Sequence, residues 1–85
     1  MRIYYSAKFV KSYKKLPIEV KLVAEKKEAI FRQNPFDPRL KTHKLKGELS
    51  EFYSFSITYH FRIVFHFESD NVIIFDTIGT HAVYK

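Results

Sequence analysis

The sequence predicts an α+β fold, in which an N-terminal two-helix hairpin packs on a small antiparallel-rich sheet in the order strand, helix, helix, strand, strand, strand. Helical spacing of apolar residues is confined to the first half of the chain, whereas alternation of apolar and polar residues fills the second half. Such segregation of helices and strands is typical of α+β proteins. With 85 residues and no internal repeat, we expect a single domain over residues 1–85.

The N-terminal half contains one short strand and two helices. Residues 2–5 favour a strand because they include isoleucine and two tyrosines. Ser6 can cap the next helix, in which apolar residues recur at helical spacing as far as Leu16. Pro17 suits the first turn of a second helix, which we expect to end at about Gln33. Because the connection between them is tight, the two helices should form an antiparallel hairpin.

The C-terminal half is expected to form three strands. Residues 34–38 contain two prolines and break the helix, and the basic loop 39–47 follows. Residues 53–58 and 61–67 alternate between apolar and polar side chains, as half-buried strands do. Residues 72–78 are a nearly continuous apolar run, which is typical of a central strand with both faces partly covered.

The alternation also assigns a face to each side chain of the strands. The apolar positions should point toward the helices: Tyr53, Phe55, Ile57, Phe61, Ile63, Phe65 and Phe67. The opposite face then carries Ser54, Ser56, Arg62 and His66. We expect this opposite face to be open, with the basic loop at one side and the C-terminal tail at another.

The positive charge is concentrated in one half of the chain. Residues 1–47 carry 13 Lys and Arg against 4 acidic residues, whereas residues 48–85 carry 2 against 5. The resulting net charges are +9 and −3. A basic region of this kind attracts polyanions, so we expect nucleic acid or an acidic protein as a partner; the alternative is a merely solubilising surface.

Several classes of protein are disfavoured. The absence of cysteine excludes disulfides and thiolate zinc sites. Nothing resembles a signal peptide, and the longest uncharged run, Phe52–Phe61, is too short to span a membrane. We therefore expect a cytoplasmic protein without membrane contact. The histidines show no metal-binding spacing, so no cofactor is expected.

Four short motifs, in this order, resemble the RelE/ParE toxin superfamily over nearly the whole chain. They are His43-Lys44-Leu45-Lys46-Gly47, Tyr53-Ser54-Phe55-Ser56-Ile57, Phe61-Arg62-Ile63-Val64-Phe65, and Ile78-Gly79-Thr80-His81 followed by Val83-Tyr84. The Gly-Thr-His ending is more similar to the nuclease branch, the RelE- and YafQ-like mRNA interferases of type II toxin–antitoxin systems.

The resemblance implies a metal-independent endoribonuclease that cleaves mRNA, often on the ribosome, and thereby inhibits translation. It also implies a cognate antitoxin that neutralises the toxin, with operator DNA contacted only through that antitoxin. Two other hypotheses about the function stay open. One is a ParE-like poison of DNA gyrase without nuclease activity, and the other is an inactive relative that only binds its antitoxin and operator DNA.

RNA cleavage by this route needs a base for the ribose 2′-hydroxyl, an acid for the leaving 5′-oxygen and a cation for the charged intermediate. Histidine suits the first two roles and arginine the third. By resemblance, Arg62 contacts the scissile phosphate, His81 is a functional residue after the last strand, and Tyr84 stacks on or acts near the cleaved nucleotide. His43 matches a loop histidine of the YafQ-like subgroup.

Further residues are candidates for RNA contact rather than for chemistry: Lys41, Lys44, Lys46, Ser54, Ser56 and His60. Ser54 and Ser56 stand where relatives carry lysines or a histidine, so the identity of the acid and base stays open. For Arg62 the structural alternative is a plain exposed strand arginine or an ion pair with Glu51 or Asp76. We interpret His66, near the far end of its strand, as structural.

Overall fold

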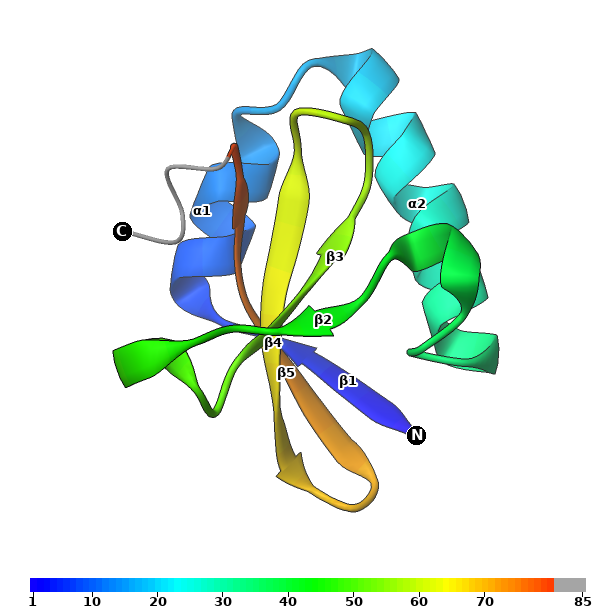
Figure 1. Ribbon diagram of the computed structural model, residues 1–85. Helices are drawn as coiled ribbons and strands as arrows, with labels where there is room; N and C mark the ends of the chain where they lie inside the picture. Colours follow the sequence, from blue (N-terminus) through cyan, green and yellow to red (C-terminus); the bar gives the residue numbers. More distant parts are fainter. Residues whose placement is uncertain (81–85) are drawn as a thin grey trace.

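The elements of the computed structural model follow the predicted order, with one short strand and two 3-10 helices added (Figure 1). The structure describes residues 1–80. The elements are β1 (Arg2–Tyr5), α1 (Ala7–Lys14), α2 (Ile18–Gln33), η1 (Pro38–Leu40), β2 (His43–Lys44), η2 (Gly47–Leu49), β3 (Tyr53–Ser56), β4 (Arg62–Ser69) and β5 (Val72–Gly79). The predicted α+β class is thus confirmed.

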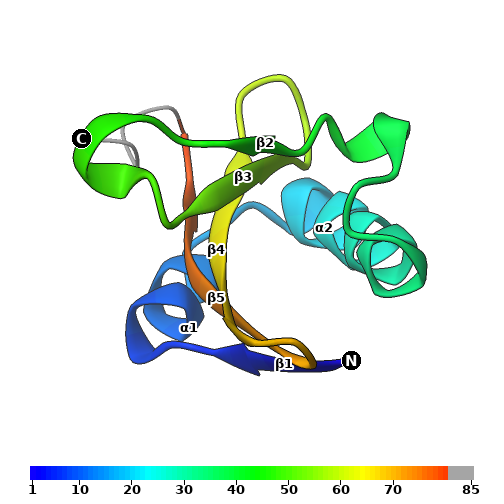
Figure 2. The same ribbon diagram turned by 60° about the horizontal axis from the view of Figure 1, so that its bottom comes forward.

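The strands form one mixed, mostly antiparallel sheet in the order β1-β5-β4-β3-β2, which Figure 2 shows from bottom to top. Only β1 pairs in parallel, with β5. Because β5 lies between β1 and β4, it is a central strand, as its apolar run predicted. The basic loop 39–47 was expected to be irregular, but His43 and Lys44 pair with Ser54 and Tyr53 as an edge strand.

The helix boundaries follow from local chemistry. Ser6 caps α1 as predicted, since its hydroxyl accepts a hydrogen bond from the Phe9 amide at 2.9 Å. The same hydroxyl donates to the carbonyl of Asp76 at 2.7 Å, which ties the start of α1 to β5. Pro17 is the cap residue of α2 rather than its first helical residue. The helices of residues 1–80 lack the combination of length and hydrophobicity that a membrane span requires.

The core lies between α2 and the sheet and is built around one phenylalanine. Phe31 of α2 is fully buried and its ring centroid lies 4.8 Å, 4.9 Å and 5.2 Å from those of Phe55, Phe65 and Phe75. These three residues come from β3, β4 and β5, so α2 covers the face that the alternation assigned to the core. That face assignment is confirmed for the central strands; Phe67, near the end of β4, is 38% exposed.

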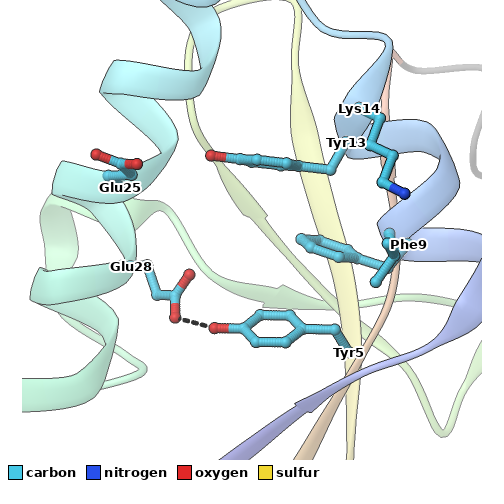
Figure 3. Close-up of a pocket in the computed structure, with 7 residues that line it drawn as sticks. Tyr5, Phe9, Tyr13, Lys14, Glu25 and Glu28 are labelled. Atoms are coloured by element: carbon cyan, nitrogen blue, oxygen red, sulfur yellow. Dashed lines mark hydrogen bonds between the residues drawn. The ribbon is translucent and has the colours of Figure 1, made fainter.

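The two helices do not pack as a close hairpin along their length. They are joined at Leu16-Pro17 as expected, but α1 runs beside the second half of β5 whereas α2 crosses the sheet face (Figure 1). Rings from β1 and α1 fill part of the space between the helices and leave a groove (Figure 3). The reason is that Ser6, which directly follows the edge strand β1, ties the start of α1 to β5.

Candidate functional site

The sheet face opposite α2 carries four of the candidate residues in two rows. In one row, His43 of β2 pairs with Ser54 of β3, which pairs with Val64 of β4. In the next row, Ser56 pairs with Arg62 and Arg62 pairs with Gly79 of β5. Residues directly opposite each other in antiparallel strands project from the same face. The register therefore puts His43 on the same face as Arg62, which the sequence alone did not indicate.

Arg62 begins β4 and is held at the end of the sheet. Its side chain is half-buried, and one terminal nitrogen, Nη1, donates a hydrogen bond to the hydroxyl of Ser56. The other, Nη2, lies 3.5 Å from the carbonyl oxygen of Tyr59. Among residues 1–80, no salt bridge joins Arg62 to Glu51 or Asp76, and the carboxylate of Asp76 binds His66 instead. Two neutral groups, the Ser56 hydroxyl and the Tyr59 carbonyl, thus help to position the guanidinium.

His43 is an exposed side chain with a defined hydrogen bond. Its Nδ1 lies 3.1 Å from the carbonyl oxygen of Lys41, and a carbonyl can only accept. In the neutral ring the proton therefore sits on Nδ1, which leaves Nε2 with a lone pair directed away from this contact. Val64, which shares a row with His43, is two residues from Arg62, so the α-carbons of His43 and Arg62 are separated by about 7 Å along the strands and about 10 Å across them.

The face opposite α2 is covered at its centre rather than open. Ser54 is fully buried and Val64 is only 5% exposed. The segment after β2 folds back, since the amide of Leu45 donates to the carbonyl of Phe52 and the amide of Phe52 donates to that of Leu49. Leu49 and Phe52 line one hollow together with Val64 and its strand neighbours. Leu49 and Phe52, in residues 45–52, thus lie over this face, and Ser54 does not reach the surface.

The remaining candidates divide into exposed residues and residues that lie outside the description. His60 is exposed in the β3–β4 turn, where its amide donates to the hydroxyl of Thr58. The lysines of the basic segment are all exposed: Lys41, Lys44 and Lys46. Ser56 is buried apart from 9% of its surface and contacts Arg62. His81 and Tyr84 lie outside the described residues.

A second cluster on this face escaped the sequence analysis. His66 Nδ1 lies 2.8 Å from Asp76 Oδ2, and its Nε2 lies 3.0 Å from Glu68 Oε2. The pairing of β4 with β5 shifts between Val64 and Phe65, and this bulge turns Asp76 toward His66. Partial burial lowers the pKa of His66, but hydrogen bonds and charges of Asp76 and Glu68 outweigh it and raise the pKa. The cluster supports the structural interpretation of His66.

The His66 cluster predicts a pH dependence of stability. The pKa of His66 is raised in the native protein. Its contribution to the free energy of unfolding is therefore complete below the pKa of the unfolded chain, about 6.5, and is lost as the pH rises through the native pKa. Urea unfolding at about pH 6 and about pH 8 should show a lower free energy of unfolding at the higher pH. His66→Gln should flatten that difference, whereas the exposed His43→Gln should retain it. An equal pH dependence in His66→Gln and the parent would contradict the assignment.

Among residues 1–80, no three His, Asp or Glu side chains are arranged so that they hold a metal ion. The His66 cluster is instead an ion-pair network, because both ring nitrogens face carboxylates, which a protonated imidazole satisfies as a double donor. Phe52 packs edge-on against the same ring at 5.5 Å between centroids. The contact between Phe52 and His66 thus holds residues 45–52, which fold back after β2, against β4 and β5.

Comparison with known proteins shows the fold. No protein-family model matches the chain, and none of the curated proteins matches its sequence. Solved structures do match: YafQ from E. coli has a TM-score of 0.81 at 19% identity, covering 99% of this chain and 98% of that one. The YoeB/ParE toxin from Agrobacterium tumefaciens has a TM-score of 0.80 at 18% identity, covering 95% of this chain and 99% of that one. A chain of the toxin–antitoxin complex RelBE2 from Mycobacterium tuberculosis has a TM-score of 0.76 at 15% identity, covering 94% of this chain and 96% of that one. The chain therefore has a RelE-like fold over its whole described length.

Proposed function

We propose that this chain is the toxin of a type II toxin–antitoxin pair and that it cleaves mRNA on the ribosome. The fold it shares with YafQ, a YoeB/ParE toxin and a RelBE2 complex supports the toxin class. The observation that carries the nuclease assignment is Arg62, half-buried at the end of the sheet with its guanidinium held by Ser56 and the Tyr59 carbonyl. An arginine fixed in this way can bind a phosphate without first losing conformational freedom.

The reaction is an internal transfer at phosphorus. The ribose 2′-oxygen forms a bond to the adjacent phosphorus, and the bond from that phosphorus to the 5′-oxygen of the next nucleotide breaks. A base takes the proton of the 2′-hydroxyl and an acid returns one to the 5′-oxygen, so the products are a 2′,3′-cyclic phosphate and a 5′-hydroxyl. The pentacoordinate intermediate carries extra negative charge, which a guanidinium stabilises through paired hydrogen bonds. The steps need no metal ion.

The described residues suit particular roles in this scheme. Arg62 binds the scissile phosphate, with Ser56 as its positioning partner. His43 serves as the base, because the Lys41 carbonyl directs the proton to Nδ1 and leaves the lone pair of Nε2 available. The resemblance implies that His81 and Tyr84 are functional, and we assign the role of the acid to His81, with Tyr84 stacking on or acting near the cleaved nucleotide.

RNA outside the reacting phosphate meets the exposed basic segment. Lys41, Lys44 and Lys46 are exposed beside His43, and His60 is exposed in the turn that precedes Arg62. Such lysines attract the phosphate backbone without reading its sequence. Ser54 makes no RNA contact in this scheme because it is fully buried.

The proposed partners follow from the charge distribution and the toxin class. A cognate antitoxin neutralises the chain, and its acidic residues complement the net charge of +9 over residues 1–47. Operator DNA is reached only through that antitoxin. The protein acts in the cytoplasm, where translating ribosomes are found.

The test is cleavage of a defined mRNA by the purified chain in a translation reaction, read by primer extension. We expect cuts that require the chain and that end in 5′-hydroxyl groups. Expression of the chain alone should halt growth, and co-expression of an antitoxin from the adjacent gene should restore it. A gyrase supercoiling assay runs in parallel. Inhibited supercoiling without any RNA cut would refute the nuclease assignment in favour of a ParE-like poison.

A further inference from the structure

A groove between α1 and α2 is not used by the proposed cleavage. It has a volume of about 340 Å³ and is open to solvent (Figure 3). Its lining residues come from β1, α1 and α2: Tyr5, Phe9, Val10, Tyr13, Lys14, Glu25 and Glu28. None of these residues belongs to the face that carries Arg62 and His43, so the groove is a separate surface.

One wall of the groove is a row of three aromatic rings. Phe9 is 5% exposed and stacks between two tyrosines, at 5.3 Å from Tyr5 and 5.9 Å from Tyr13 between ring centroids. The interplanar angles are 28° and 18°, so the rings are nearly parallel. Figure 3 shows both hydroxyl ends directed toward α2. The two tyrosines thus stand on either side of a buried ring, with parts of their surfaces accessible from the groove.

The facing wall carries two carboxylates of α2. Glu28 accepts hydrogen bonds from the Tyr5 hydroxyl and, at 3.1 Å, from Arg32, which fixes its position. Glu25 lies nearly one turn earlier and is exposed. Burial and the charges of Glu25 and Glu28 all raise the pKa of Tyr13, so their negative potential extends across the groove to the aromatic wall.

This concentration of acid is unusual for this part of the chain. Only 4 acidic residues occur in residues 1–47, and Glu25 and Glu28 are two of them. Carboxylates repel phosphates, so the groove disfavours nucleic acid although the surrounding half is basic. A neighbouring contact shows that the same wall accepts a cation, since Lys21 Nζ lies 5.8 Å from the centroid of the Tyr13 ring, outside the groove lining.

We propose that this groove binds an arginine side chain presented by a partner polypeptide. A guanidinium is planar and weakly hydrated, so it stacks on the tyrosine faces while its N–H groups donate to Glu25 and Glu28. Val10, 41% exposed, and Lys14 also line the groove. They favour an apolar and an acidic residue next to the arginine, which indicates a polypeptide segment rather than a free cation. The site is independent of RNA cleavage.

The direct test titrates the full chain with N-acetyl-arginine amide and follows the ring signals of Tyr5 and Tyr13 by NMR. The matched control is N-acetyl-citrulline amide, which has nearly the same shape but no charge. We expect saturable shifts with the arginine compound and much weaker shifts with citrulline. Equal shifts by both compounds, or no saturable shift by arginine, would overturn the proposal. A short RNA that saturates the same signals would also overturn it.

Two variants locate the binding in the groove. Glu25→Gln removes one carboxylate and should weaken arginine binding about fivefold, whereas Glu19→Gln, on the same helix but outside the groove, should leave it unchanged. Tyr13→Leu should weaken binding as well, and its circular dichroism spectrum checks that it folds. If Glu25→Gln and Glu19→Gln bind equally well, the assignment fails. Because Glu25→Gln should still cut mRNA at the parent rate, failure here is distinguishable from failure of the nuclease proposal.

Discussion

Arg62→Ala is expected to slow mRNA cleavage by about 10²-fold or more, the usual effect of removing a preorganised donor that stabilises developing charge. The guanidinium is half-buried and held by Ser56 and the Tyr59 carbonyl, so it is in position before the substrate arrives. Alanine removes both terminal nitrogens while β4 keeps its pairing through the backbone. The rate is measured by primer extension under single-turnover conditions. Undiminished cleavage would remove Arg62 from the site.

Three variants serve as controls for the loss of charge. Arg62→Lys should restore only part of the rate, because an ammonium cannot form two parallel hydrogen bonds with a phosphate. Ser56→Ala should slow cleavage less than Arg62→Ala does, since it removes only the group that holds Nη1. Arg2→Ala changes an exposed arginine on β1, at the edge of the sheet, and should leave the rate unchanged. A similar loss in Arg2→Ala would indicate a general charge effect.

Phe31→Ala is expected to lower the free energy of unfolding by about 3–5 kcal/mol, the range for deleting a buried phenylalanine. Phe31 is fully buried and contacts rings from three strands, so its removal leaves a cavity bounded by the side chains that join α2 to the sheet. A domain of this size has a total stability of roughly 5–15 kcal/mol, so the variant should be near the limit of folding. Urea unfolding followed by circular dichroism measures the change.

Phe36→Ala is the matched control for this prediction. Phe36 also stacks on aromatic neighbours, Tyr53 at 5.8 Å and Phe67 at 6.2 Å, but it is 52% exposed. Phe36→Ala should therefore lower the free energy of unfolding by about 1.5 kcal/mol or less. If both variants lose the same free energy, ring stacking rather than burial stabilises the core, and the central role of Phe31 is wrong.

Periodicity in the sequence was sufficient for most of the fold. The alternation in residues 53–67 identified which side of β3 and β4 meets the helix, because side chains project from a strand with a period of two whatever its neighbours are. Ser6 and Pro17 marked the helix starts to within a residue, since capping depends on adjacent backbone groups. The same parity predicted that Arg62 lies opposite the core.

The short edge strand was beyond this kind of inference. His43-Lys44 is only two residues long and has no alternation of its own, so only the register with β3 reveals that His43 shares a face with Arg62. The β-bulge at Asp76 is similar, because an extra residue in one strand of a pair leaves no periodic signal. The His66 cluster, which depends on that bulge, was missed for this reason.

By itself, the sequence determined the class of fold, the order of the main elements, the basic half and the face of Arg62, since each of these depends on neighbours within about one or two turns of chain. Only the tertiary structure decided how much of the opposite face is open, because Leu49 and Phe52 cover Val64 through a segment that folds back from β2. It likewise decided that α1 lies beside β5 rather than along α2, through the Ser6 hydrogen bond to Asp76 seventy residues away. The aromatic groove exists for that reason: contacts distant in sequence set the separation of two helices that are adjacent in sequence.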